Sequence, residues 1–162
     1  MGKVLSAFTN GFPGAVSRSV DDIIHAWPNM GSNPIPFGAP VFMNSAKTGV
    51  IPGSASSLFA DFVGFAVRIP AKTPDSYTGQ GSDTGSYQPS EMVDTLQRGT
   101  IIGKVTGGTP KPMGAVYYVL ATGELSADAG SEGDTIQLEN CSFGNVPDAT
   151  GCVEIVVRYR NA

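Results

Sequence analysis

The stretch Val63-Gly64-Phe65-Ala66-Val67-Arg68-Ile69 places large apolar side chains at every second position, which is the period of a β-strand with one buried face. Three other runs, at residues 100–105, 115–120 and 153–159, are similarly rich in β-branched and aromatic residues. Weaker runs at 92–97 and 135–138 lie between them, and glycine stands at most boundaries. The sequence therefore predicts an all-β fold, an antiparallel β-sandwich or a jelly-roll-like domain.

The composition is that of a folded domain with many turns. Glycine and proline number 21 and 12 of 162 residues. This is about a fifth of the chain, above the usual share of roughly 12% but below the roughly 25–30% of low-complexity sequences. Charged residues make up only 15% and the net charge is −4. A surface with so little charge is suited to association, and the scattered basic residues argue against nucleic-acid binding.

The chain has no segment that predicts secretion or membrane insertion. No apolar run approaches the roughly 18 residues of a membrane span, and the N-terminus does not resemble a signal peptide. We therefore expect synthesis in a reducing cytoplasm and no membrane partner. In that compartment a disulfide between Cys141 and Cys152 is not expected, and both are predicted to be small buried residues.

The first 50 residues differ from the rest in their closely spaced prolines and glycines. Such spacing excludes long helices and central strands, so residues 1–50 are predicted to form an extended N-terminal arm with the first edge elements. Residues 51–162 are predicted to form the β-sandwich domain. Within the arm, Ser19–Ile24 fits either a short helix capped by Ser19 or an edge strand.

Two loops interrupt the strand pattern. Residues 71–90 are polar, rich in glycine and serine, and long for a compact domain, which makes them a candidate contact loop. Residues 126–134 are acidic, and they fit a solvated turn better than a calcium-binding loop because the regular ligand spacing is missing.

No motif in the sequence predicts catalysis, a metal site or a cofactor. His25 is the single histidine, which leaves a serine or cysteine nucleophile without an obvious base. Gly103-Lys104 lacks the preceding glycine and following hydroxyl of a phosphate-binding loop. A hydrolase with paired carboxylates remains the only enzymatic alternative, since a sequence does not reveal the distance between two acids.

The order of several short motifs resembles the structural cement proteins, or head decoration proteins, of tailed bacteriophages. The resemblance covers residues 10–160 and departs from the family in the loops at 71–90 and 126–134. The motifs that carry it are Gly11-Phe12-Pro13-Gly14-Ala15-Val16-Ser17-Arg18, Pro36-Phe37-Gly38-Ala39-Pro40-Val41, Asp61-Phe62-Val63-Gly64-Phe65-Ala66-Val67, Tyr87-Gln88-Pro89 and Val93-Asp94-Thr95-Leu96-Gln97-Arg98-Gly99.

The resemblance implies a capsid decoration protein on the outer surface of the virion. Such a protein binds the shell of the major capsid protein, bridges neighbouring capsomers after the head expands, and forms homodimers or homotrimers on local symmetry axes. A proline-restricted arm suits this role because it loses little entropy when it binds a partner.

Six aromatic residues are the predicted partner-binding residues, with ordinary core packing as the alternative for each. An alternative function is a carbohydrate- or receptor-binding module displayed on the virion, in which Trp27, Tyr77 and Tyr87 would stack on sugars. The six predicted contact residues are Phe8, Phe12, Trp27, Phe37, Tyr77 and Tyr87.

Overall fold

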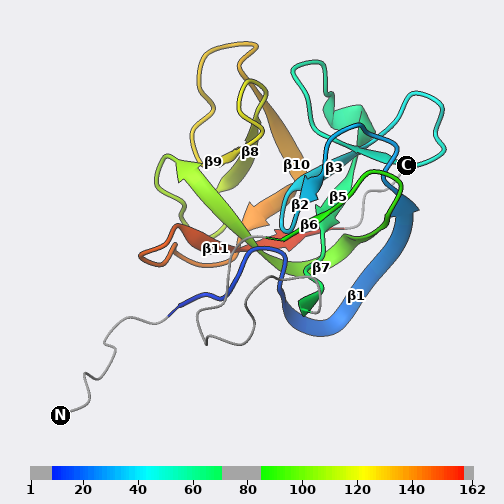
Figure 1. The fold of residues 1–162 in the computed structure, drawn as a ribbon. Coiled ribbons are helices and arrows are strands. Elements are labelled where there is room, and N and C mark those ends of the chain that lie inside the picture. Colours follow the sequence, from blue (N-terminus) through cyan, green and yellow to red (C-terminus); the bar gives the residue numbers. More distant parts are fainter. Residues whose placement is uncertain (1–8, 71–84, 159–162) are drawn as a thin grey trace.

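The computed structural model describes residues 9–70 and 85–158, and the described chain is all-β, as predicted (Figure 1). Its one helical element is a 3-10 turn at Phe59–Asp61. The strands are β1 (Val16–Pro28), β2 (Ile35–Pro36), β3 (Pro40–Met43), β4 (Val50–Pro52), β5 (Phe62–Ala66), β6 (Ser86–Tyr87), β7 (Met92–Gly107), β8 (Ala115–Val119), β9 (Leu125–Ser126), β10 (Thr135–Phe143) and β11 (Cys152–Val157).

Five strands close into a barrel in the order β7-β11-β10-β8-β9 and back to β7. The closing contact is the parallel pair of β7 and β9, where Val105 lies opposite Leu125. The barrel is filled by the larger of two apolar cores, which includes Ile101, Val116 and Ile155. A closed barrel removes the free sheet edges that a sandwich keeps. The expected sandwich or jelly-roll architecture is therefore corrected to a barrel with extra strands.

The barrel closes because β7 is a single strand of 16 residues that pairs along both edges. The sequence predicted two strands there, separated by a turn at Arg98-Gly99. Gly99 instead continues the strand with a φ of +126°, a conformation that glycine adopts readily. The first part of β7 pairs with β1 and β5, and the second part belongs to the barrel.

The first part of β7 supports a second layer of structure outside the barrel. The sheet continues from β7 through β5 and β3 to β4, and β1 lies on the other edge of β7. A bridge between Asn29 and Val50 joins the end of β1 to β4. The space between these strands holds a smaller apolar core, which the β2–β6 pair helps to enclose. We call it the second core, and its buried residues are Ile35, Phe37, Val41, Val50, Ala66, Tyr87 and Val93.

Strand β5 contributes to both cores, whereas its alternation predicted one buried and one lighter face. Phe62 pairs with Phe42 and Gly64 pairs with Val41, so that Val63 is an extra residue in the strand. This β-bulge lets Phe62 and Phe65 point into the same core, with ring centroids 5.5 Å apart. Ala66 faces the second core. Both faces of β5 are thus covered.

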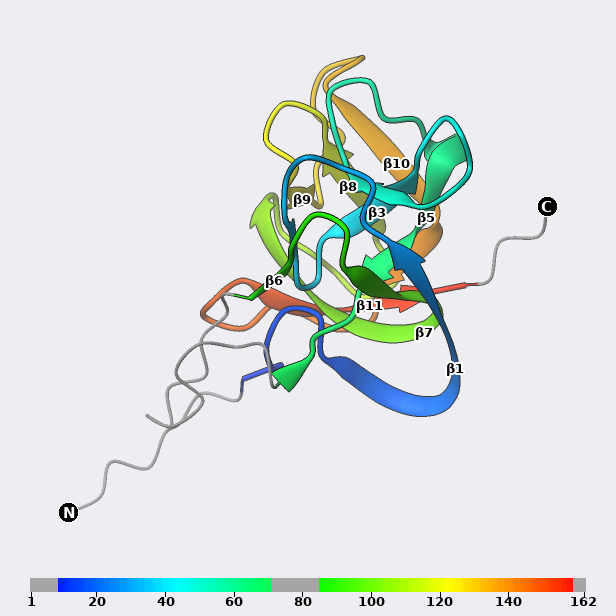
Figure 2. The same ribbon diagram turned by 45° about the vertical axis from the view of Figure 1, so that its right-hand side comes forward.

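Within the predicted arm, Val16–Pro28 and Pro40–Met43 are strands of this sheet. Of the two alternatives for Ser19–Ile24, the edge strand is confirmed and the helix is wrong, because these residues lie within β1. Figure 2 shows β1 as a curved ribbon along the outside of β7. Residues 1–8, the start of the predicted arm, and residues 71–84 of the predicted contact loop lie outside the described residues.

Candidate interaction surfaces

The segment before β1 lies across the chain's own barrel. Gly14 donates a backbone hydrogen bond to Ile102 of β7 and accepts one from Arg68, while Ile102 donates to Ala15. These contacts extend the pairing of β1 along β7 toward the N-terminus. The segment is therefore held by the domain itself.

This crossing requires glycine at two facing positions. Gly14 has a φ of +81°, and a Cβ atom there would lie 2.8 Å from the backbone nitrogen of Gly38. Gly38 has a φ of +76°, and its Cβ would lie 2.7 Å from the nitrogen of Gly14. Any side chain at either position would separate the two segments, so glycine is needed for both the backbone conformation and the close approach.

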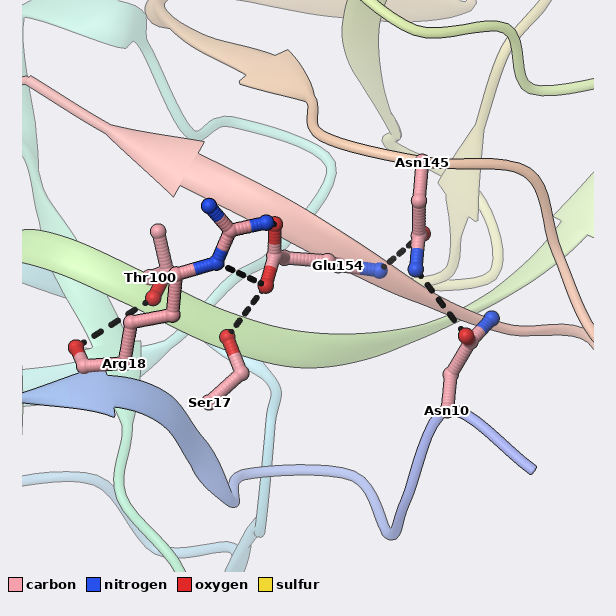
Figure 3. Close-up of polar contacts among 6 residues, drawn as sticks. All are labelled: Asn10, Ser17, Arg18, Thr100, Asn145 and Glu154. Carbon is pink, nitrogen blue, oxygen red and sulfur yellow. Dashed lines mark hydrogen bonds and ion pairs between the residues drawn. The ribbon is translucent and has the colours of Figure 1, made fainter. Parts of the chain in front are cut away.

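The N-terminal end of this segment is tied to the β10–β11 loop by Asn10. Its backbone N–H donates to Asp148 Oδ2 at 2.8 Å, and its side-chain amide donates to the carbonyl oxygens of Val146 and Cys152. Asn145 Nδ2 donates to Asn10 Oδ1 at 2.9 Å, while Asn145 Oδ1 accepts a hydrogen bond from the backbone of Glu154 (Figure 3). Asn10 thus connects the segment before β1 to the loop between β10 and β11.

Asp148 organises the loop that receives Asn10. Its Oδ1 accepts hydrogen bonds from the backbone and hydroxyl of Thr150 and from the backbone of Cys152. Partial burial alone would raise the pKa of Asp148, but the hydrogen bonds from Thr150, Asn10 and Cys152 outweigh it, and the pKa lies below its ordinary value of 3.8. The ionised carboxylate is therefore the form that the folded loop stabilises.

A second group of contacts centres on Glu154, a buried charged residue in β11 that is only 5% exposed. Arg18 Nη2 donates to Glu154 Oε1 at 2.9 Å, Arg18 Nε donates to Oε2 at 3.2 Å, and the Ser17 hydroxyl donates to Oε2 at 2.7 Å (Figure 3). The carboxylate is thus satisfied by a two-point arginine contact. We call the following residues the latch: Asn10, Ser17, Arg18, Asn145, Asp148 and Glu154.

Exposed apolar side chains gather on and beside β1. Ile24 is 45% exposed and Met92, which lies opposite Pro28 in the β1–β7 pairing, is 53% exposed. Ile23 and Met30 are also exposed. Exposed large apolar side chains on one edge strand and its neighbours are candidates for an association site. We call Ile23, Ile24, Met30 and Met92 the strand patch.

A second exposed apolar area lies in two loops that meet at the end of β10. Met113 is 87% exposed and adopts a φ of +66°, which is uncommon for a residue with a side chain. Its backbone N–H donates to the carbonyl of Phe143, the last residue of β10. Val146, in the loop that Asn10 contacts, is 61% exposed. We call Met113 and Val146 the loop patch.

The six predicted contact aromatics have different environments. Phe37 and Tyr87 are buried in the second core, where their rings meet edge to face, so the core-packing alternative describes their position. Phe12 is 42% exposed beneath the guanidinium of Arg68, whose Cζ lies 4.7 Å from the ring centroid. Trp27 is half-buried and stacks on the exposed His25. Phe8 and Tyr77 lie outside the described residues, and all six remain predicted contacts.

Both cysteines are buried, as predicted, and the two are not joined in a disulfide. Burial raises the pKa of Cys141, an effect that the nearby Arg158 only partly offsets, so the thiolate is disfavoured. Among residues 9–70 and 85–158 there is no group of three or more histidine, cysteine or acidic residues that could hold a metal ion. The same residues include no helix long and apolar enough to cross a membrane.

Sequence reasoning missed the latch and the strand patch. A glutamate flanked by Val153 and Ile155 in an otherwise apolar strand was the available signal, because a charge in such a run needs a partner. Nothing local identified Arg18 as that partner across 136 residues. The adjacent Ile23 and Ile24 fit a short helix and an edge strand equally well, so the sequence did not predict their exposure.

Comparisons with known proteins place this architecture in a family. A family model described as XM1 gp53 minor capsid protein matches residues 3–157. Among solved structures, a chain from the capsid of Myoviridae phage XM1 is similar, with a TM-score of 0.72 and 15% sequence identity over 95% of this chain and 94% of that chain. At this identity the likeness shows a shared fold. A comparison with curated proteins found no match.

Proposed function

The chain belongs to the XM1 gp53 minor capsid protein family, and from that membership we propose that it is a cement protein of the phage head. The membership confirms the resemblance to phage head proteins carried by the sequence motifs, and a capsid structural role in the virion follows from it. As a cement protein, it would bind the outer surface of the major capsid protein shell and stabilise the expanded head by bridging neighbouring capsomers.

The observation that supports bridging is the separation of the two apolar areas. The strand patch lies along β1, and the loop patch lies where the β10–β11 loop meets the end of β10. The bend of β1 and the β10–β11 loop are on opposite sides of the molecule in both views (Figures 1 and 2). A protein that joins two neighbours needs two contact areas that face different ways. Many copies acting together would also gain avidity from modest individual contacts.

The latch supports a mechanical role because it connects elements that a load would otherwise separate. Arg18 and Ser17 join the first strand to Glu154 of the last strand, and Asn10 joins the segment before β1 to the β10–β11 loop. The barrel between them is closed by backbone hydrogen bonds on all sides. A force applied at either patch is therefore distributed over β1, β7 and β11.

We propose a structural rather than an enzymatic role. Within the described residues, His25 stacks on Trp27, and the side chains of Asp61, Asp148 and Glu154 are engaged in ion pairs or hydrogen bonds. The alternative of a carbohydrate-binding module draws no support from Tyr87, since its ring is buried and its hydroxyl donates to the carbonyl of Val67 at 2.6 Å.

The proposal is tested on phage heads assembled without this protein. Purified protein is added to expanded and to unexpanded heads, and its occupancy is measured by cryo-electron microscopy. We expect density over the outer surface of expanded heads at junctions between capsomers, together with a higher temperature of head disruption. Density inside the head, or full occupancy with no gain in head stability, would contradict the proposal.

A further inference from the structure

Asn10 is followed by glycine, and no other asparagine of this sequence is. Because glycine has no Cβ atom, its backbone nitrogen can approach the preceding side chain without steric hindrance. This is the arrangement in which an asparagine amide reacts most readily with the next backbone nitrogen and loses ammonia, a spontaneous reaction called deamidation. Asn10 also connects the segment before β1 to the β10–β11 loop, so a change of its side chain acts directly on the latch.

The attacking nitrogen of this reaction is available in the folded chain. Among the described residues, none accepts a hydrogen bond from the backbone N–H of Gly11. Gly11 has a φ of +116°, and a Cβ atom added there would lie 3.6 Å from Ile102 Cγ1, an ordinary contact distance. Neither hydrogen bonding nor crowding at Gly11 therefore slows the reaction.

The side chain of Asn10, by contrast, is held in place. Its Nδ2 donates to the carbonyl oxygens of Cys152 at 2.7 Å and Val146 at 2.9 Å. Its Oδ1 accepts from Asn145 Nδ2 at 2.9 Å, and Figure 3 shows the side chain pointing from its segment toward Asn145. To form a cyclic imide with the nitrogen of Gly11, the amide has to turn back onto its own backbone, which breaks these hydrogen bonds. The reaction therefore requires this part of the latch to open.

From these contacts we propose that Asn10-Gly11 is a deamidation site protected by the latch, and that reaction during an opening prevents the latch from closing again. The rate then equals the rate in an unfolded chain multiplied by the fraction of molecules in which the contact is open. One hydrogen bond of this kind shifts such an equilibrium by about fivefold, and three together by about a hundredfold. This site is independent of the proposed function.

Water is the only co-reactant. The nitrogen of Gly11 loses its proton to hydroxide and forms a bond to Asn10 Cγ, the Cγ–Nδ2 bond breaks, and ammonia leaves with a proton that water returns. A second water then adds to one of the two imide carbonyl carbons and breaks its bond to the Gly11 nitrogen. Addition at Cγ gives aspartate, and addition at the backbone carbonyl gives isoaspartate, in which the main chain runs through Cγ. The net reaction consumes water, replaces the amide by a carboxylate and releases ammonia.

Neither product fits the closed latch. A carboxylate has no N–H to donate to the carbonyl oxygens of Val146 and Cys152, which accept from Nδ2 in the native chain. It also adds a negative charge beside Asp148, whose Oδ2 accepts from the backbone N–H of Asn10 at 2.8 Å. Closing the contact would place acceptors against acceptors and like charges together, which is unfavourable. Opening followed by reaction is therefore irreversible.

The first test measures deamidation at residue 10 of the full chain by peptide mapping and mass spectrometry. The chain is kept at mildly alkaline pH, because hydroxide promotes the reaction, either folded or unfolded in guanidinium chloride. We expect the folded chain to react more slowly by about tenfold or more. Equal rates in the two states, or no reaction at residue 10 of the unfolded chain, would overturn the inference.

Low concentrations of guanidinium chloride distinguish opening of the latch from unfolding of the whole domain. Opening of a small contact exposes little surface, so the rate at residue 10 should stay nearly constant below the unfolding transition. A rate that instead rises in proportion to the global unfolding constant would show that the latch does not control the reaction.

Asn145→Ala tests the protecting contact directly. It removes the donor to Asn10 Oδ1, and the folded chain should deamidate about fivefold faster at residue 10. Asn33→Ala is the matched control, because Asn33 is exposed and lies between β1 and β2. It should leave the rate unchanged, and both variants should match the wild type when unfolded. If Asn145→Ala has no effect on the folded chain, or both variants have the same effect, then the latch does not protect Asn10.

The second test examines the product. Deamidated chain carries an additional negative charge, is separated by ion exchange, and should unfold at a lower denaturant concentration than the native chain. Asn10→Asp should lower the midpoint more than Asn10→Ala, because alanine only removes the donors, whereas aspartate also places a charge beside Asp148. A deamidated chain as stable as the native one, or an aspartate variant no less stable than the alanine variant, would refute the block to closure. All of these measurements use the isolated chain, so their outcome is separate from whether the protein binds phage heads.

Discussion

Arg18 and Glu154 join the first and last strands of the fold, with Arg18 Nη2 2.9 Å from Glu154 Oε1 and Arg18 Nε 3.2 Å from Oε2. The glutamate side chain is 7% exposed, whereas the arginine side chain is 70% exposed. The two residues therefore differ in how much each depends on the other. A buried carboxylate depends on its donors, but an exposed guanidinium that loses its partner returns to water at little cost.

This asymmetry predicts the effect of Glu154→Ala. The substitution removes the carboxylate that accepts hydrogen bonds from Arg18 and Ser17. It also leaves space beside Gly144, where a Cβ atom, if one were present, would lie 2.5 Å from Glu154 Oε1. Since a hydrogen bond to a charged group contributes about 1.5–3 kcal/mol, the free energy of unfolding should fall by about 2 kcal/mol. Urea unfolding measures the change. Glu139→Ala, at an exposed position of β10, is the control and should alter stability by less than about 0.5 kcal/mol.

The lowered pKa of Asp148 predicts a dependence of stability on pH. A carboxylate whose folded pKa is below its ordinary value of 3.8 stabilises the fold above that value and loses the contribution as pH falls through the folded pKa. Asp148→Asn removes the charge that accepts from Asn10 and Thr150. The wild type should therefore be more stable than the variant near neutral pH, and the difference should shrink as pH falls below 3.8. A constant difference from neutral to strongly acidic pH would contradict this role.

The close contact between Gly14 and Gly38 predicts that a side chain at position 14 will lower the stability of the fold. A second glycine with a similar backbone conformation but no close neighbour separates this steric cost from the cost of backbone strain. Gly14 and Gly133 have similar left-handed conformations, with φ of +81° and +87°, but a Cβ at Gly133 would meet nothing within 4 Å. Gly133→Ala should therefore cost only the backbone strain, about 1 kcal/mol. Gly14→Ala should cost about 3 kcal/mol or more, because it also forces two backbone segments apart. Chemical unfolding of both variants measures the difference, and equal losses would show that the crossing tolerates a methyl group.

The strand positions could be predicted from the sequence because they depend on local alternation. Residues 115–119 and 152–157 form β8 and β11 close to the predicted limits. Barrel closure could not be predicted in this way. It depends on the two-residue strand β9, which has no detectable period, and on the pairing of β11 with β7, which is distant in sequence. The bulge at Val63 likewise depends on the partner strand β3.

The candidate contact residues were predicted less well than the strands, for a physical reason. A large aromatic side chain has the same sequence signature whether it fills a core or covers a partner, since both environments remove apolar area from water. Phe37 and Tyr87 lie in the core, while the exposed apolar area is formed by Ile24, Met92 and Met113. Exposure depends on which strand edges the fold leaves open, and one sequence does not specify that.

Because Phe37 and Tyr87 are buried, substitutions there are expected to lower the stability of the fold. Unfolding experiments distinguish this effect from a loss of binding to the phage head. Phe37→Ala should lower the free energy of unfolding by about 3–5 kcal/mol because it leaves a cavity in the second core. Tyr87→Phe removes the hydrogen bond to Val67 and should cost about 1 kcal/mol. Unfolding experiments measure both. If instead either variant keeps its stability and loses head binding, then these residues act as direct contacts.

The latch predicts that two N-terminal truncations will have different effects. Deleting residues 1–8 removes Phe8 but keeps Asn10, Ser17 and Arg18, so the temperature of unfolding should not change. Because Phe8 is a predicted contact, occupancy on expanded heads should fall. Deleting residues 1–20 also removes the donors to Glu154 and should destabilise the domain, so that any loss of binding would have two causes. Full occupancy after the shorter deletion would exclude Phe8 as a contact, whereas unchanged stability after the longer one would mean that the barrel does not depend on the latch.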